Sequence, residues 1–358
     1  MNKQKLLSLV FAFLLAATGG LIFHLLHIPV AWLLGSIASI MIFSLITKKE
    51  LYWPPFLRNL GIVIIGYSMG LSLTKEALIF ISHQLPSMFI MTVLIILFST
   101  MTALLISKFT GINYPSVLIG SIPGGLSQMM ILAEETKGVN VTVVTFLQVI
   151  RLIMIIFLVP VLIFGPIFGE SQSYVTEAAA PTWNGLYPNI ILFIIAAIFL
   201  SIIFKKMRAP TPFLLGPIIG TAILGLIGFN GPELPIGLLD LSQILIGVNI
   251  GLMMHPENLD HKVRLIGLAT LFSTLLIFGC LLLSYLLSTF FHFSAATSFL
   301  SLSPGGMDQM AIIAHEVGAD LSVITGYQLF RLFFIFFAVP PLLKWVFKTT
   351  SKVSRSSE

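Results

Sequence analysis

Long apolar stretches separated by short polar breaks make up most of this chain. A transmembrane helix needs about 20 mainly apolar residues, and ten stretches approach that length. They lie near residues 6–23, 29–47, 57–73, 86–107 and 139–166, and again near 187–204, 210–228, 237–254, 265–289 and 320–343. We predict a transmembrane helix for each of them.

Two further apolar segments, 112–137 and 293–318, are each interrupted near their centre by Pro-Gly-Gly. Proline and glycine together end or break a helix. A helix from Ile112 to Gly124 would be about 18 Å long at 1.5 Å per residue. That length reaches just past the middle of a hydrocarbon core about 30 Å thick. We therefore predict two re-entrant hairpins whose Pro-Gly-Gly tips lie near the membrane midplane.

The same features recur at a nearly fixed spacing, which indicates an internal duplication. The first interrupted segment reads PGGLSQM from Pro123, and the second reads PGGMDQM from Pro304, an offset of 181 residues. PVAWLLG from Pro29 and PTPFLLG from Pro210 match at the same offset. The polar residues that follow the tips correspond at an offset of 180: Gln148 and Arg151 with Gln328 and Arg331.

Composition agrees with a membrane protein. The chain is 57% hydrophobic and 9% charged, with a mean hydropathy of +1.04, whereas a soluble domain carries about 25% charged residues. We predict an all-α polytopic membrane protein whose first partner is the lipid bilayer.

The net charge of +5 does not indicate a nucleic-acid partner, because the basic residues lie at the ends of apolar runs. The single Cys280 excludes a disulfide framework.

Lysine and arginine positions predict the orientation of the chain. If neither interrupted segment crosses the membrane, 16 of the 19 basic residues are cytoplasmic, Lys75 is outside, and Arg151 and Arg331 are within the bilayer. If both cross, ten are inside and seven outside. Basic residues concentrate on the cytoplasmic side, so the re-entrant arrangement is favoured. Both termini are then cytoplasmic, and we expect the protein in the cell (plasma) membrane.

This arrangement predicts two repeats of opposite orientation. Five transmembrane helices and one hairpin per repeat give an odd number of crossings, so the second repeat enters the membrane inverted. We expect membrane repeat 1 at 1–166, an extracytoplasmic linker at 167–186, membrane repeat 2 at 187–346 and a cytoplasmic tail at 347–358. Inverted repeats with interrupted helices at matching positions are typical of secondary transporters.

The intramembrane arginines and the hairpin tips are the candidate solute-binding residues. A charge at the bilayer centre costs about 2.5–3.5 kcal/mol, so each arginine needs a partner. That partner is either an anionic solute or a permanent acid such as Glu135, Glu316 or Asp308. A half-helix begins at each tip, and its free amides favour a carboxylate; the alternative is a packing turn. The candidate residues are Pro123, Gly124, Gly125, Ser127, Gln128, Gln148, Arg151, Pro304, Gly305, Gly306, Asp308, Gln309, Gln328 and Arg331.

Three carboxylates are candidates for ion coupling. Asp308 stands where the first repeat has Ser127, so the two tips differ chemically. Asp308, Glu135 and Glu316 are expected to bind H⁺ or Na⁺ if transport is coupled, and the alternative for the two glutamates is a solvated helix end. The histidines are scattered, whereas a metal site needs three or four converging ligands. We predict no metal site, no cofactor and no enzyme.

The paired PGGLSQM and PGGMDQM motifs, each followed by Gln-x-x-Arg, resemble the AbrB-type integral membrane family. The resemblance covers the whole chain except about the last dozen residues. One label of the family implies indirect regulation of gene expression, and another implies an ammonia monooxygenase. The family supplies no catalytic residues to carry over.

We predict a secondary transporter that moves a small anionic or carboxylate solute with H⁺ or Na⁺. The alternative is a membrane sensor or regulator that acts indirectly on gene expression, and a membrane monooxygenase is a third reading. The sequence leaves a homo-oligomer open.

Overall fold

The computed structural model describes residues 3–47, 51–124, 126–136, 138–165, 189–253 and 262–355, and the regular elements there are all α-helices. The predicted linker at 167–186 and Gly125 lie outside the described residues. The backbone of Ser127 and Gln128 is described, but their side chains are not.

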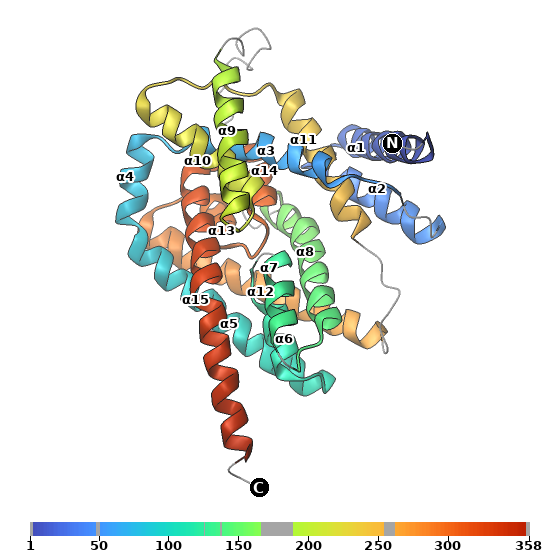
Figure 1. Ribbon diagram of the computed structural model, residues 1–358, viewed down its shortest axis with the longest axis vertical. Coiled ribbons are helices and arrows are strands. Elements are labelled where there is room, and N and C mark those ends of the chain that lie inside the picture. The colour runs from blue at the N-terminus through green and yellow to red at the C-terminus, as the bar shows by residue number, and fades with distance from the viewer. Residues whose placement is uncertain are drawn as a thin grey trace. The chain divides into compact units, whose positions relative to one another are not determined.

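The described helices are labelled in chain order in Figure 1 and are grouped below by predicted repeat. The first repeat contains α1 (Lys3–Leu25), α2 (Ala31–Thr47), α3 (Pro55–Leu71), α4 (Lys75–His83), α5 (Leu85–Thr110), α6 (Tyr114–Ser121), α7 (Leu126–Glu135) and α8 (Val141–Ile163). The second contains α9 (Ile190–Lys206), α10 (Pro212–Ile227), α11 (Ile236–Leu252), α12 (Lys262–Phe291), α13 (Ala295–Leu302), α14 (Met307–Glu316) and α15 (Leu321–Arg355). Helices α3, α6 and α7 have the same bounds as α11, α13 and α14 after a shift of 181 residues.

Five of the described helices are long and apolar enough to cross a membrane, namely those at Gln4–Leu25, Leu85–Thr110, Val141–Ile163, Ile266–Phe291 and Leu321–Leu343. Helices α3 and α4 form a bent pair with an angle of 84° between them. If this pair is one span, the number of candidate spans rises to six. Helices α2, α9, α10 and α11 have 16 or 17 residues, at the lower limit of about 17–25 for a spanning helix. The chain is therefore a helical polytopic membrane protein, and ten crossings stay a prediction.

The chain forms two compact units, and each takes helices from both repeats. Unit 1 comprises Met1–Ser82, Pro160–Leu259 and Asp308–Thr325, and unit 2 comprises His83–Val159, Asp260–Met307 and Gly326–Glu358. Unit 1 thus contains α1–α3, α9–α11 and nearly all of α4 and α14. Unit 2 contains α5–α7, nearly all of α8, and α12, α13 and most of α15.

Unit 1 is held together by close helix packing in two equivalent pairs, because α2 packs on α11 and α3 packs on α10. A Cβ atom added at Gly70 of α3 would lie 2.6 Å from Thr221 Cβ of α10. The equivalent Gly251 of α11 would place a Cβ atom 2.9 Å from Ile40 Cβ of α2. Small residues allow backbones to approach this closely. The pairs Gly66/Gly70 of α3 and Gly247/Gly251 of α11, each spaced as Gly-x-x-x-Gly, therefore serve helix packing.

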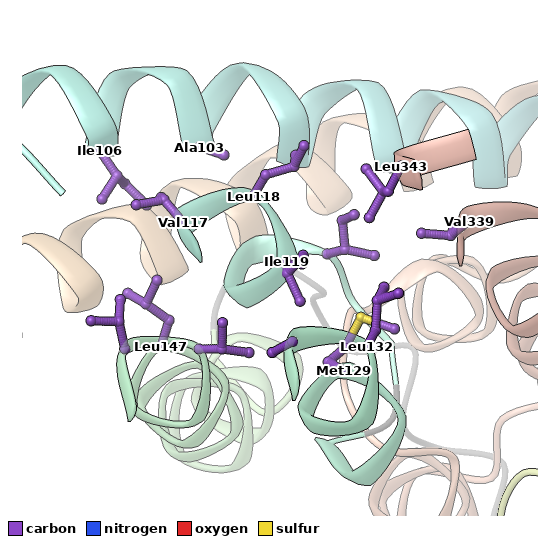
Figure 2. Packing of buried hydrophobic residues seen from close by; sticks show 14 of the residues in the cluster. Ala103, Ile106, Val117, Leu118, Ile119, Met129, Leu132, Leu147, Val339 and Leu343 are labelled. Carbon is purple, nitrogen blue, oxygen red and sulfur yellow. The ribbon is translucent and has the colours of Figure 1, made fainter. Parts of the chain in front are cut away.

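Unit 2 contains the interrupted helix of the first repeat. Figure 2 shows α6 between Ala103 of α5 on one side and Leu147 of α8 on the other. Val117 and Ile119 of α6 are fully buried in this cluster. Apolar packing on both faces therefore fixes the position of a helix that is only 8 residues long.

Two elements differ from the prediction. Helix α4 lies between two predicted spans, where its nine partly polar residues gave no transmembrane signal. Helix α15 continues through Arg355, so the predicted tail at 347–358 is helical over its described part. No proline or glycine follows Pro341 to end the helix.

Candidate functional site

The interrupted segment α6–α7 returns to the place where it begins. Asn113, just before α6, donates from Nδ2 to the carbonyl oxygen of Gly138, just after α7. The amide of Asn140 donates to Ser116 Oγ at 2.7 Å. Two hydrogen bonds therefore join the start of the segment to its end, as expected of a hairpin.

The break in this hairpin leaves carbonyl groups at the end of α6 without an amide partner in the helix. Ile122 is extended, with φ −64° and ψ 130°, and Pro123 has no amide proton. The last carbonyls of a helix have no amide partner within the helix. In a membrane interior without water, these carbonyls need other donors.

Arg151 of α8 supplies those donors. Its Nη1 donates to the carbonyl oxygen of Ile122 at 2.7 Å and to that of Ser121 at 3.4 Å. Its Nη2 donates to the carbonyl oxygen of Gly124 at 3.4 Å and to Gln148 Oε1 at 2.6 Å. Gln148 Nε2 in turn donates to the carbonyl oxygens of Ile119 and Ile122. Arginine and glutamine thus cap the C-terminus of α6.

Arg331 of α15 repeats this arrangement at the end of α13. Its Nη1 donates to the carbonyl oxygens of Leu302 and Ser303 at 3.1 and 2.8 Å. Its Nη2 donates to the carbonyl oxygen of Gly305 at 3.3 Å and also to Gln328 Oε1. Arg151 is 8% exposed and Arg331 is 4% exposed, so both caps are buried.

Within the chain, the hydrogen-bond partners of the two arginines are therefore not the predicted acids. Each guanidinium bonds to backbone carbonyls and to one glutamine, not to Glu135, Glu316 or Asp308. A helix C-terminus carries about half a negative charge, so it favours an arginine. The signal for this role was in the sequence, because each Gln-x-x-Arg follows a Pro-Gly-Gly break.

The two arginines also lie near one another within unit 2. They are close enough to repel each other, and the buried Cys280 of α12 lies near both. The carboxylates of unit 2 are confined to Glu134, Glu135, Asp260 and the C-terminal Glu358. Glu134 and Glu135 are exposed at the end of α7. The buried positive charge of unit 2 therefore has no carboxylate partner among its described membrane-embedded residues.

Asp308 belongs to unit 1 and lies in the first turn of α14. Its carboxylate accepts hydrogen bonds from the backbone amides of Asp308 and Gln309, and Arg58 is the basic residue that attracts it. Gln309 Nε2 donates to Asp308 Oδ2 at 3.2 Å. The amides that we expected to bind a carboxylate at this tip thus hold the carboxylate of the chain itself.

Glu316 lies in a polar cluster of unit 1 that the sequence did not predict. Gln243 of α11 donates from Nε2 to Glu316 Oε1 at 3.4 Å and accepts from the amide of Leu33 at 3.2 Å. Asp240 lies one turn before Gln243 and is close enough to Glu316 to be repelled by it. Neither residue belongs to a repeated motif, so no sequence signal identified them. Among the described residues, no group of three His, Cys, Asp or Glu residues forms a metal site.

Comparisons with known proteins extend over almost the whole chain. A family model described as "Transition state regulatory protein AbrB" matches residues 32–347. "Uncharacterized protein YhjN" of Bacillus subtilis (strain 168) is 25% identical over 364 aligned positions, which cover 96% of this chain and 94% of the relative. "Putative regulator AbrB" of Escherichia coli (strain K12) is 27% identical over 326 positions, which cover 90% of this chain and 92% of the relative.

Proposed function

We propose that this chain, which belongs to the family described as transition state regulatory protein AbrB, is a secondary transporter of a small anionic or carboxylate solute. It acts in the plasma membrane with both termini cytoplasmic, and transport is coupled to H⁺ or Na⁺. Enzymatic activity forms no part of this proposal.

The observation that carries the proposal is the pair of interrupted helices at matching positions of two repeats. Helices α6 and α13 each end at a break followed by a second half-helix, and a buried Gln-x-x-Arg caps each break. Irregular backbone at membrane depth is either buried in protein or lines a cavity, and in secondary transporters the interrupted helices form the substrate site. A helix that only anchors the chain gains nothing from such a break.

Helix directions in unit 1 support inverted repeats. Gly247 of α11 lies against Ser36 of α2, and Gly251 lies against Ile40. Residue numbers rise together along the two helices, so α2 and α11 run in the same direction. The contacts of Gly66 with Pro217 and of Gly70 with Thr221 give the same result for α3 and α10.

This parallel packing supports an inverted relation between the repeats. Successive spanning helices α2 and α3 run in opposite directions across a membrane. Helix α10, which packs parallel to α3, therefore runs opposite to α2, its own counterpart in the first repeat. Opposite directions of equivalent helices are what inverted repeats require.

Charge supports an anionic solute and a coupling cation. Unit 2 carries two buried arginines without a membrane-embedded carboxylate among its described residues, which favours an anion there. Unit 1 carries Asp308 in the first turn of α14 and the cluster of Glu316 and Asp240. We assign coupling to Asp308 and Glu316, whereas Glu135 at the exposed end of α7 would act at the membrane edge.

Uptake by purified protein in proteoliposomes tests the proposal. With an inward H⁺ or Na⁺ gradient, we expect at least one labelled mono- or dicarboxylate to accumulate, and we expect the accumulation to stop when an ionophore removes the gradient. Asp308→Asn should abolish the stimulation by the gradient. Glu233→Gln, which neutralises an exposed carboxylate, is the matched control and should retain it. Absence of flux of every tested solute and ion would refute the proposal.

A regulatory role is the second candidate, and the name "Putative regulator AbrB" of the Escherichia coli relative favours it. A membrane regulator can act on gene expression indirectly, without moving a solute. The same proteoliposomes separate the two candidates, because a sensor that does not transport leaves the vesicle contents unchanged.

A further inference from the structure

A small cavity opens beside Arg151 in unit 2. It has a volume of about 20 Å³, and its polar lining residues are Arg151, Thr102, Ser121 and Ser273. This volume has room for one water-sized group, because about 10–15 Å³ is enough for a single water molecule. Leu147 and Phe272 contribute apolar walls.

The polar groups around this cavity can donate hydrogen bonds to a bound acceptor. Arg151 Nε is buried and has no hydrogen-bond partner, although both Nη atoms are bonded to the hairpin. The hydroxyls of Ser121 and Ser273, which line the same cavity, can each donate one hydrogen bond. A buried polar group without a partner costs about 1–3 kcal/mol, and an N–H of a charged guanidinium favours a charged acceptor.

The equivalent position beside Arg331 is filled by different side chains. Tyr327 replaces Leu147, Leu302 replaces Ser121 and Met88 replaces Ala269 of the cavity wall. Tyr327 is 3% exposed, and its hydroxyl shares a hydrogen bond of 2.6 Å with Ser87. Larger side chains thus occupy the position beside Arg331, although the two arginines cap their hairpins in the same way.

We propose that the cavity beside Arg151 binds one small monovalent anionic group, and that the position beside Arg331 does not. Arg151 Nε and the hydroxyls of Ser121 and Ser273 donate to this group. The helix C-terminus of α6 offsets only about half of the guanidinium charge, so positive charge remains to attract an anion. The anionic group is either a free halide or one oxygen of the carboxylate of a transported solute, since the cavity has room for one water-sized group. The second source rests on the proposed transport function.

Thermal unfolding of the purified protein tests the site without any transport. We expect bromide and formate, at constant ionic strength against gluconate, to raise the unfolding temperature of the wild-type protein in a saturable way. The double variant Ser121→Ala with Ser273→Ala should bind both ions about tenfold more weakly or worse, because it loses two donors to a charged group. Ala269→Met, which copies the second repeat, should also weaken binding by filling the cavity.

Thr92→Val is the matched control, because Thr92 is the counterpart of Ser273 beside Arg331. It should leave the effect of both ions unchanged. Equal stabilisation of the wild type and the double variant, or no stabilisation of the wild type, would overturn the site. Loss of binding in Thr92→Val but not in the double variant would place the site beside Arg331 and would equally refute the assignment.

The outcome for this site is separable from the outcome for transport. Anion binding with no uptake of any solute would leave the site intact and refute the transporter. If a solute is transported and bromide inhibits its uptake, the cavity is the binding site of the solute's carboxylate. Uptake that bromide does not affect would identify the ligand as a free halide.

Discussion

Arg331→Leu is expected to lower the stability of the folded protein more than any other single substitution considered for this chain. It removes the donors to the carbonyl oxygens of Leu302, Ser303 and Gly305 and to Gln328 Oε1. Each buried acceptor that loses its donor costs about 1–3 kcal/mol. The same substitution also removes a charge whose insertion costs about 2.5–3.5 kcal/mol. Four acceptors together outweigh that relief, so the net effect is a loss of stability.

The single Cys280 provides the measurement. It is 1% exposed, so a thiol-reactive dye should label it only when unit 2 unfolds. We expect labelling of Arg331→Leu at a temperature roughly 5–10 °C below that of the wild type, since 1 kcal/mol shifts the midpoint by about 2–4 °C in a domain of this size. Arg331→Lys keeps the charge but has a single donor group, so an intermediate loss is expected.

Lys206→Leu is the control for this series, because Lys206 is exposed in the last turn of α9. Its unfolding temperature should match that of the wild type. An Arg331→Leu protein as stable as the wild type would show that the capping of α13 contributes nothing, and would leave the buried arginine without a structural reason.

The second large effect is expected at Gly35 of α2. A Cβ atom there would lie 2.3 Å from the carbonyl oxygen of Gly19 and 2.7 Å from Gly20 Cα, both backbone atoms of α1. Backbone cannot rotate away as a side chain can, so Gly35→Ala must separate α1 from α2. Overpacking of this kind costs about 1–3 kcal/mol, occasionally more.

Gly225→Ala is the matched control for Gly35→Ala and should change stability in the opposite direction. Gly225 is also in a helix, α10, and an added Cβ atom there has no neighbour within 4 Å. Glycine in a helix is about 0.5–1 kcal/mol less favourable than alanine, so this variant should be slightly more stable. The yield of monodisperse protein in detergent and its unfolding temperature measure both effects. Equal behaviour of the two variants would contradict the close packing of α1 on α2.

Much of the fold was predictable because the same sequence motifs recur at a nearly constant offset. The offset of 181 residues between the Pro-Gly-Gly motifs reproduces the bounds of α11, α13 and α14 from those of α3, α6 and α7. The length of the apolar stretches predicted the long helices, because the thickness of the bilayer sets the length of a spanning helix. Helix α4 was missed because nine residues with charged and polar positions resemble a loop.

The candidate site was less predictable, because its contacts involve groups that a side-chain pattern does not reveal. The sequence marked Arg151 and Arg331 as buried charges, but their partners are backbone carbonyls at a helix end. Likewise, Ser121 and Ser273 have no motif of their own. They become candidate binding residues only because packing brings α6 and α12 to the same cavity. The division into two mixed units also depends on packing between repeats, which spacing along the chain cannot show.

Labelling of four single cysteines in a Cys280→Ala background tests the re-entrant, inverted architecture most directly. Lys108 and Glu134 flank the first hairpin, and Thr289 and His315 are their exposed counterparts around the second. We predict that a membrane-impermeant thiol reagent labels cysteines at Lys108 and Glu134 from the cytoplasmic side only, and cysteines at Thr289 and His315 from the outside only. Labelling at Glu134 from the side opposite to Lys108 would contradict the re-entrant hairpin, and labelling at Lys108 and Thr289 from the same side would contradict the inverted repeats.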